Sequence, residues 1–200
     1  MHLMRRKQRE RIGMETDLMT EFLNRIYPLA SGTENYIRNI AYRVQYTKGQ
    51  ILASPGKRAD EIWYLVNGLA KEYYYEASGK CIITAFWKEN ELMVIPESFF
   101  RKTPSDRYIE LVEDSVLLGL SGRQVLRLQL AHPEVHSLGY GILSFAKRKS
   151  DEKGSLLFHS AKERYSLFCE KFPWERISVA DAASYLGLTR ETLSSVRGKM

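Results

Sequence analysis

The sequence contains few cysteines and no long apolar run. Cys81 and Cys169 are the two cysteines among 200 residues, which excludes a disulfide framework or a four-cysteine metal site. No apolar segment approaches the roughly 20 residues that a membrane-spanning helix needs, and no secretory signal follows the basic N-terminus. We therefore expect a cytoplasmic protein without a membrane segment.

Familiar catalytic motifs are also absent. The sequence has no Gly-rich phosphate loop and no Gly-x-Ser-x-Gly segment. His132 and His136 are four residues apart, which suits two metal ligands on one helix face. Glutamate does not directly follow the first histidine, as it does in metalloproteases, so we interpret both as surface residues at a helix entry. We expect neither an enzyme nor a bound metal or cofactor.

Positive charge is concentrated at one end of the chain. Residues 1–13 hold five Arg and Lys against one Glu, which is +4 of the formal net charge of +6. Because the remaining chain is close to neutral, net charge alone does not predict that the folded part binds nucleic acid. We expect residues 1–13 to form a disordered, solvated tail. The alternative is an arm that contacts phosphates without sequence specificity.

The middle of the chain changes from helical to strand periodicity. Apolar residues at helical spacing over 18–29 give way to alternation from Tyr42 onward. Asn67-Gly68 is expected to form a hairpin turn because both residues tolerate positive φ, and Ser78-Gly79 marks another turn. The expected strands cover residues 42–47, 51–52, 62–66, 71–75, 81–87, 108–112 and 116–120. Short strands at this spacing predict an antiparallel β-roll within residues 14–130.

A helical segment over residues 131–153 follows the roll. Four apolar residues recur in it at spacings of three, four and three: Val135, Leu138, Ile142 and Phe145. Such a narrow seam is typical of a helix that pairs with one partner helix, and so predicts a dimerisation helix. The alternative is packing against the roll of the same chain. The basic run 147–149 is expected to end the helix as a solvated cluster.

Residues 154–200 have the pattern of a helix-turn-helix domain. A support helix is indicated by one apolar stripe: Phe158, Ala161, Tyr165, Phe168 and Phe172. Ser178 is a good N-cap for the next helix, with Asp181 three residues later in a capping-box arrangement. Gly187 allows a sharp turn, and Thr189 caps the last helix.

The last helix divides into buried and free positions. Leu193 and Val196 are its expected buried residues, so the other face is available to the major groove of DNA. Arginine can bond a guanine edge and glutamate can accept from a cytosine amino group. The candidate DNA-binding residues are Ser178, Thr189, Arg190, Glu191, Ser194, Ser195 and Arg197.

A roll, a long helix and a helix-turn-helix with the segment 189–193 (Thr-Arg-Glu-Thr-Leu) together resemble the Crp/Fnr family of transcription regulators. In the roll, the segments 48–50, 64–68 and 86–92 match the family pattern. The resemblance implies an α+β fold with a jelly roll like that of cyclic-nucleotide-binding domains, a dimerisation helix and a winged helix-turn-helix. The sequence ends at Met200, which leaves little or no room for a β-wing.

The resemblance also implies a homodimer that binds palindromic double-stranded promoter DNA, with RNA polymerase as a further partner. In the family, an Arg and a Glu at the start of the recognition helix contact base edges, and Arg190 and Glu191 occupy those positions. A second Arg often follows one turn later, where this sequence has Ser195, so a different half-site is expected. Arg197 and Lys199 are candidates for phosphate contacts.

The effector site departs further from the family pattern. Cyclic-nucleotide binders carry a Gly-Glu pair and an Arg-Ser or Arg-Thr step, where this chain has segments 90–92 and 105–107. Asp106 would repel a phosphate, so we expect weak or no cAMP binding, and an effector of unknown identity. An Fnr-type iron–sulfur site is not expected, because neither cysteine is near the N-terminus. The candidate effector-binding residues are Asn90, Glu91, Leu92, Ser105 and Arg107. A second hypothesis is a small-molecule sensor that acts through a protein partner.

Overall fold

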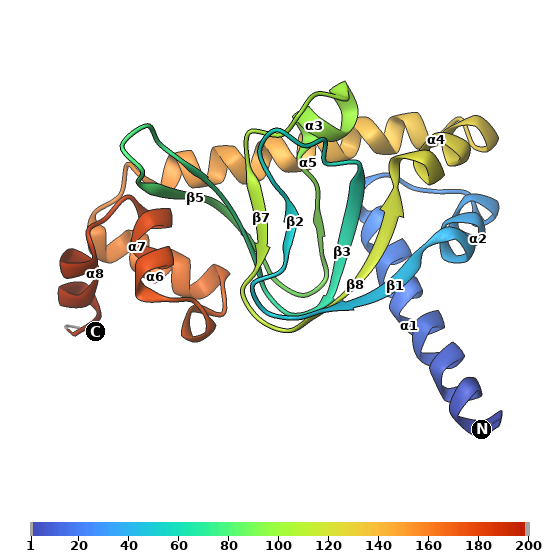
Figure 1. Ribbon diagram of the computed structural model, residues 1–200, viewed down its shortest axis with the longest axis horizontal. Coiled ribbons are helices and arrows are strands. Elements are labelled where there is room, and N and C mark those ends of the chain that lie inside the picture. The colour runs from blue at the N-terminus through green and yellow to red at the C-terminus, as the bar shows by residue number, and fades with distance from the viewer. Residues whose placement is uncertain (1, 199–200) are drawn as a thin grey trace.

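The computed structural model describes residues 2–198, and only the backbone of residues 2–10. A β-roll lies under the middle of the long helix α5 (Val135–Leu156), with helices at both ends (Figure 1). The other helices are α1 (His2–Ile26), α2 (Ser31–Ile40), α3 (Pro96–Arg101), α4 (Gly122–Ala131), α6 (Ala161–Lys171), α7 (Val179–Leu186) and α8 (Arg190–Arg197), with a 3-10 turn at Trp174–Arg176. None of the helices in residues 2–198 is long and apolar enough to cross a membrane.

The roll consists of two four-stranded antiparallel sheets, in the orders β1-β8-β3-β6 and β2-β7-β4-β5. The strands are β1 (Tyr42–Tyr46), β2 (Ile51–Ala53), β3 (Glu61–Asn67), β4 (Ala70–Tyr75), β5 (Cys81–Trp87), β6 (Glu91–Met93), β7 (Tyr108–Leu111) and β8 (Ser115–Ser121). Residues such as Trp63, Leu65, Leu111 and Leu117 fill the space between the sheets. This architecture confirms the predicted α+β fold with an antiparallel roll. The short β6 and α3 were not predicted.

The turn at Asn67-Gly68 is not a hairpin. β3 and β4 belong to different sheets, so this turn carries the chain from one sheet to the other. Gly68 alone of the two has positive φ, at 119°, and a Cβ there would lie 2.2 Å from Ser115 Oγ. The hairpin prediction is therefore wrong, because turn chemistry fixes the local backbone and not the strand that the next segment pairs with. Ser78-Gly79 does close a hairpin, between β4 and β5.

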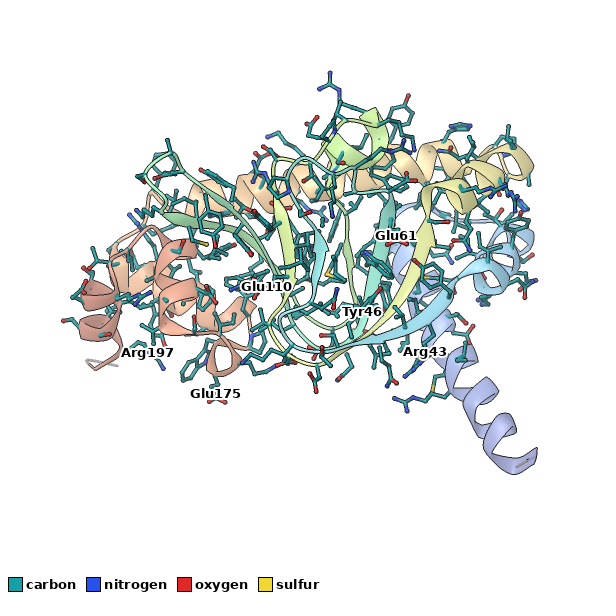
Figure 2. The ribbon with its side chains drawn as sticks, viewed as in Figure 1. Arg43, Tyr46, Glu61, Glu110, Glu175 and Arg197 are labelled. Atoms are coloured by element: carbon teal, nitrogen blue, oxygen red, sulfur yellow. The ribbon has the colours of Figure 1, made fainter. Side chains whose placement is uncertain are left out.

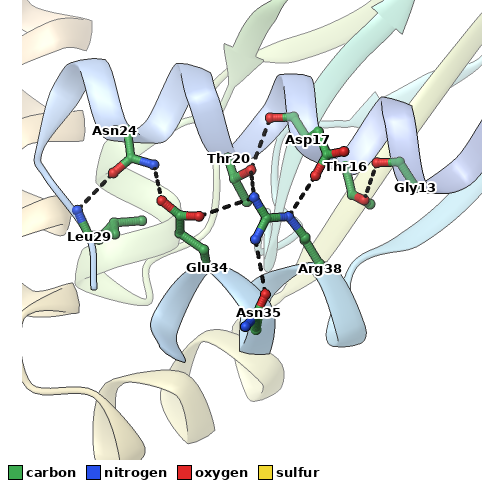
Figure 3. A network of polar contacts seen from close by, with 9 residues as sticks. All are labelled: Gly13, Thr16, Asp17, Thr20, Asn24, Leu29, Glu34, Asn35 and Arg38. Atoms are coloured by element: carbon green, nitrogen blue, oxygen red, sulfur yellow. Dashed lines mark hydrogen bonds and ion pairs between the residues drawn. The ribbon is translucent and has the colours of Figure 1, made fainter. Parts of the chain in front are cut away.

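Residues 2–13 are helical, as part of α1, so the expectation of a disordered tail is wrong. The body of α1 is joined to α2 by a polar network centred on Arg38 (Figure 3). Its Nε donates to Asp17 at 2.8 Å, and its Nη2 donates to Thr20 at 3.1 Å and to Glu34 at 3.1 Å. Asn24 Nδ2 also donates to Glu34, at 2.6 Å, and these bonds lower the pKa of that carboxyl.

The apolar seam of α5 packs within its own chain. Val135, Leu138 and Ile142 are buried in one cluster with α1 and the roll, and Phe145 packs against it. A Cβ at Gly141 would lie 2.6 Å from Ile26, so α1 already occupies this face. Our interpretation of the seam as a dimer contact is wrong, since the spacing specifies an apolar face but not the element that covers it.

The predicted end of α5 is also wrong. The helix continues past the basic run 147–149 to Leu156, and Lys149 is only 16% exposed. Its Nζ donates to the carbonyl of Phe86 at 3.1 Å and to Glu91 Oε2 at 2.8 Å. Long lysine stems can cover apolar surface and still bring their charge to a polar partner, which explains this position.

Two smaller expectations need correction. Phe158 is 92% exposed between α5 and α6, so it does not belong to the support stripe, whereas Tyr165 and Phe168 are buried as predicted. Of the two histidines, His136 is exposed and His132 Nδ1 lies 3.0 Å from Thr33 Oγ1.

Candidate nucleic-acid interface

α7 and α8 form a helix-turn-helix on the support helix α6. The Ser178 hydroxyl accepts from Asp181 N at 3.0 Å at the start of α7, although the Asp181 carboxylate does not complete a capping box. Gly187 has φ of 63° at the end of α7, which a residue with a side chain rarely adopts. Thr189 accepts from Thr192 N at 3.1 Å to begin α8. Ala183 is 2% exposed, which allows the close approach of the two helices.

The side chains of α8 divide as the sequence predicts. Leu193 is 0% exposed, and Val196 packs against the same cluster. The N-cap Thr189 is exposed, and so are Arg190, Glu191, Thr192, Ser194 and Ser195 on α8. The pKa of the Glu191 carboxyl is lowered by hydrogen bonds from its own backbone N–H and from Thr189, which favours the charged form. The predicted contact residues therefore lie together on one accessible surface.

Two further candidates lie at the edge of that surface. Ser178 is exposed at the start of α7. Arg197 is partly buried, and its guanidinium carbon lies 5.4 Å from the ring centre of Trp174. Figure 2 shows Arg197 at the end of the molecule away from Arg43 on β1. Lys199 lies outside the described residues.

The C-terminal helical unit, residues 161–198, packs on the hairpin β4–β5. Lys71 Nζ lies 3.2 Å from Asp181 Oδ2, which explains why the capping box is incomplete. Ser184 Oγ donates to the carbonyl of Cys81 at 2.9 Å and accepts from Ile83 N at 3.0 Å. Phe86 of β5 lies in the apolar cluster of this unit. Apolar burial and specific hydrogen bonds thus hold the unit in one orientation on the roll.

Arg176 adds an ion-pair network to this junction. Its guanidinium donates to Glu89 at 2.7 Å and also to Glu113, and its own pKa is raised by these carboxylates. Burial opposes ionisation of Glu89, but hydrogen bonds from Arg176 and backbone N–H groups lower the pKa of Glu89 overall. Lys71, Arg176 and Ser184 were not singled out from the sequence, because their partners are distant along the chain.

A cavity of about 640 Å³ lies where the roll, α5 and the C-terminal helical unit meet. Of the candidate effector residues, Leu92 and Arg107 line it. Glu91 instead forms an ion pair with Lys149 at 2.8 Å. Asn90, with φ of 63°, accepts from Tyr64 Oη at 3.1 Å, and Ser105 Oγ donates to the carbonyl of Arg107 at 2.8 Å. The structure therefore brings two of the five candidates to the cavity.

Arg107 already has carboxylate partners within the chain. Its Nη1 donates to Glu72 Oε1 at 3.3 Å, and its Nε lies 3.5 Å from Asp106 Oδ1. Thr84 Oγ1 donates to the same Glu72 oxygen at 2.5 Å. Burial raises the pKa of Glu72 despite these hydrogen bonds. Glu72 was missed in the sequence, although its place in the alternating β4 strand is a signal that it points to the same side as Tyr74.

Comparison with known proteins agrees with this architecture. A family model described as Cyclic nucleotide-binding domain matches residues 43–132. The chain is 28% identical over 167 residues to the Anaerobic regulatory protein of Haemophilus influenzae, covering 76% of this chain and 64% of the relative. It therefore spans slightly less than two thirds of that relative's length.

Solved structures share the fold. FixK2 from Bradyrhizobium japonicum has a TM-score of 0.70 and 19% identity, covering 80% of this chain and 84% of that chain. A Crp/Fnr-family transcriptional regulator from Eubacterium rectale has a TM-score of 0.67 and 15% identity, covering 88% and 87%. The class is thus a cyclic-nucleotide-binding β-roll joined by a long helix to a helix-turn-helix. The chain is therefore similar in sequence to a regulatory protein and shares its fold with regulators that include a member of the Crp/Fnr family.

Proposed function

We propose that this protein is a homodimeric regulator that binds palindromic DNA through α8. The observation that carries the proposal is the division of this short helix into the buried Leu193 and an exposed polar face with Arg190 and Glu191. An exposed helix face preceded by a tight turn fits the width of the major groove. The accessible Ser194 and Ser195 then lie beside the bases or the phosphate backbone.

Arg190 and Glu191 have different roles in this proposal. Arg190 offers two parallel N–H donors to a guanine edge, and Glu191 accepts from a cytosine amino group. Ser178, Thr189 and Arg197 contact the sugar-phosphate backbone or neighbouring bases. Contacts to phosphates position the protein, whereas contacts to base edges provide sequence specificity.

The dimer contact lies on the outward face of α5 in our proposal, because the inward seam is already covered. Tyr140 is 73% exposed on this helix, which makes it a candidate for contact with a second copy. A two-fold dimer places its two α8 helices about 34 Å apart, so that they meet half-sites one DNA turn apart. RNA polymerase is the further partner that a promoter-bound regulator implies.

The test is selection of bound duplexes from a random DNA library by the purified protein. Enrichment of a palindrome supports a dimeric regulator, and enrichment of one half-site alone contradicts the dimer. Arg190→Ala should then weaken binding to the selected site by about 1–3 kcal/mol and leave binding to random DNA nearly unchanged. Arg123→Ala is the matched control, because Arg123 is an exposed arginine on α4. Equal losses on selected and random DNA would exclude Arg190 as a base contact.

The cavity of about 640 Å³ supports a second candidate function, a small-molecule sensor that acts through a protein partner. Failure to enrich any DNA at low salt, with a saturable small-molecule effect on thermal stability, favours this alternative.

A further inference from the structure

A second cavity, of about 240 Å³, lies at the end of the roll where β3 begins and β8 ends. Its walls come from β2, the loop before β3, and parts of β3, β7 and β8, and its lining differs from that of the cavity of about 640 Å³ except at Ile95. Figure 2 shows Glu61, which lines this second cavity, well away from Arg197 on α8. The second cavity is therefore separate from the proposed DNA-binding surface.

The carboxylate of Glu61 faces the space between the two sheets. Successive side chains of a strand alternate between its two faces, so Glu61 lies on the same face of β3 as Trp63 and Leu65. Those two residues fill the space between the sheets, and the partly buried Glu61 lines the cavity at the end of that space. A charge in such a position is costly unless a partner compensates it.

Glu61 has a hydrogen-bond donor as its partner, but not a cation. Tyr42 Oη donates to Glu61 Oε1 at 2.6 Å, and burial together with this bond raises the pKa of Tyr42, so the phenol keeps its proton. No lysine, arginine or histidine among the described residues forms an ion pair with Glu61. The charge of Glu61 also contributes, after burial, to the raised pKa of Tyr46. The second oxygen of the carboxylate therefore remains an acceptor for a positively charged donor.

The other charged residues at this cavity neutralise one another. Arg58 Nη2 lies 2.6 Å from Asp60 Oδ1, and Lys102 Nζ lies 3.8 Å from the same oxygen. The side chains of the two cations are 43% and 50% exposed, so solvent screens their charge. The lining itself holds one arginine and two carboxylates, and Arg58 is paired with Asp60. One negative charge, that of Glu61, is therefore left for a ligand to compensate.

The rest of the wall is aromatic and aliphatic. Trp63 lines the cavity, and the rings of Tyr42 and Tyr46 meet it edge to face, with their centres 5.7 and 6.0 Å from its own. Gly119 permits this packing, because a Cβ there would lie 2.4 Å from Tyr42 and 2.5 Å from Trp63. Tryptophan attracts cations better than the other aromatic side chains do. The aliphatic part of the wall consists of Leu52, Ala53, Ile95 and Ile109.

The size of the cavity limits the ligand. A volume of about 240 Å³ is below the roughly 300–1,000 Å³ of sites for drug-sized ligands, so it suits a molecule of a few heavy atoms. We propose that this end of the roll binds a small primary ammonium ion with a short apolar body, its N–H groups donating to the accessible oxygen of Glu61 and its body against Trp63. The charge-assisted hydrogen bond provides most of the affinity. The class of ligand is a protonated alkylamine, and its site does not depend on the proposed DNA binding.

The test uses two probes of the same shape that differ in charge: n-butylammonium and its neutral counterpart 1-butanol. The indole N–H signals of the three tryptophans, observed by NMR in the full-length protein, report on three places. Trp63 lines this cavity, Trp87 lines the larger cavity, and Trp174 lies in the C-terminal helical unit. Butylammonium should move the Trp63 signal most and bind about tenfold more tightly than 1-butanol. No response, or a response that is largest at Trp87, would overturn the proposal.

Glu61→Gln removes the charge of this side chain and keeps an acceptor for Tyr42. It should lower the affinity for butylammonium about tenfold or more, because the bond to the ammonium group loses its charged acceptor, and leave the affinity for 1-butanol nearly unchanged. Glu76→Gln is the matched control, because Glu76 is exposed in the turn between β4 and β5, and it should change neither affinity. Equal losses of both probes in Glu61→Gln would show that the charge of Glu61 does not hold the ligand.

A second variant changes the affinity in the opposite direction. Arg58→Gln removes a positive charge from the lining and leaves Asp60 without its nearest cation, so it should raise the affinity for butylammonium about twofold or more. A folding defect does not produce opposite effects on one probe in two variants. Unchanged or weaker butylammonium binding in Arg58→Gln would contradict the charge balance on which the proposal rests. Arg190→Ala should leave all of these affinities unchanged, so failure of the DNA-binding proposal is distinguishable from failure of this one.

Discussion

The two halves of α5 are held against the rest of the chain by different chemistry. The first half is fixed by the buried apolar residues Leu138 and Ile142, which pack with α1 and the roll. The second half lies on β5 through ammonium groups: Lys149 bonds to the Phe86 carbonyl and Lys153 to the Ile83 carbonyl. Apolar burial is strongly favourable and non-directional, whereas a hydrogen bond from a charged group contributes about 1.5–3 kcal/mol net because water competes for it.

This difference indicates where the molecule can change its arrangement. The weakly held half of α5 lines the cavity with Lys149, Ser150 and Lys153, and the first half reaches it at Ile142 and Leu143. Release of two lysine contacts costs far less than exposure of the apolar half. We infer that the second half of α5 can separate from β5 at a lower cost than the first half can leave α1 and the roll.

The largest predicted effect is a loss of stability from a substitution in the first, apolar half of α5. Leu138→Ala should lower the free energy of unfolding by about 2–5 kcal/mol, because it removes a 4% exposed side chain from a packed cluster. Leu130→Ala is the control, since Leu130 is 78% exposed, and it should change the free energy of unfolding by about 0.5 kcal/mol or less. Chemical denaturation measures both values. Similar values for the two variants would show that the first half of α5 is not anchored by burial.

A smaller effect is expected in the polar half. Lys149→Met should lower the free energy of unfolding by about 1–3 kcal/mol, because it leaves Glu91, which is 17% exposed, without its cation. Adding Glu91→Gln should recover part of the loss, as expected for two residues that act as a pair. Lys147→Met, on the same helix but with its side chain 72% exposed, should have little effect. If Lys149→Met lowered the free energy of unfolding as much as Leu138→Ala does, the two halves of α5 would be held equally firmly.

The sequence predicts well those features that depend on local pattern. Alternation located most strands, and the positions of Leu193, Gly187 and Thr189 predicted the buried, turning and capping roles found in the helix-turn-helix. The exposed positions of Arg190 and Glu191 follow from the same helical periodicity. Each of these inferences uses residues only a few positions apart.

Features that depend on distant partners were not predictable in this way. Lys149 was interpreted as solvated, because its acceptor on β5 is 63 residues away in the chain. The seam containing Leu138 has the spacing of a dimer helix, yet α1 of the same chain covers it. Arg107 was selected for its charge, but the carboxylate that faces it, Glu72, is on β4 and 35 residues away in the chain. Periodicity identifies a face, and only the tertiary fold identifies its partner.

The smallest predicted effect concerns Glu72, which faces the polar half of α5. It tests how well water and charged groups stabilise that half. Burial raises its pKa above the ordinary value of 4.5, outweighing the hydrogen bonds from Thr84 and Arg107. As the pH rises above 4.5, the Glu72 carboxyl loses its proton in the unfolded chain before it does so in the folded chain. The stability that protonated Glu72 contributes is therefore lost as the pH rises through the pKa of the folded state. Glu72→Gln cannot titrate and should avoid this loss.

The thermal unfolding midpoint of Glu72→Gln, relative to that of the unchanged protein, should therefore rise from pH 4.5 until the folded pKa is passed, and then stay constant. Glu97→Gln is the control, because the side chain of Glu97 is 72% exposed. A constant difference for Glu72→Gln across the whole range would mean that water or the cation Arg107 fully compensates the buried carboxylate. In that case the polar half of α5 faces a solvated pocket. Water then competes for the hydrogen bonds of its two lysines, so these bonds stabilise the fold much less than the burial of Leu138 does.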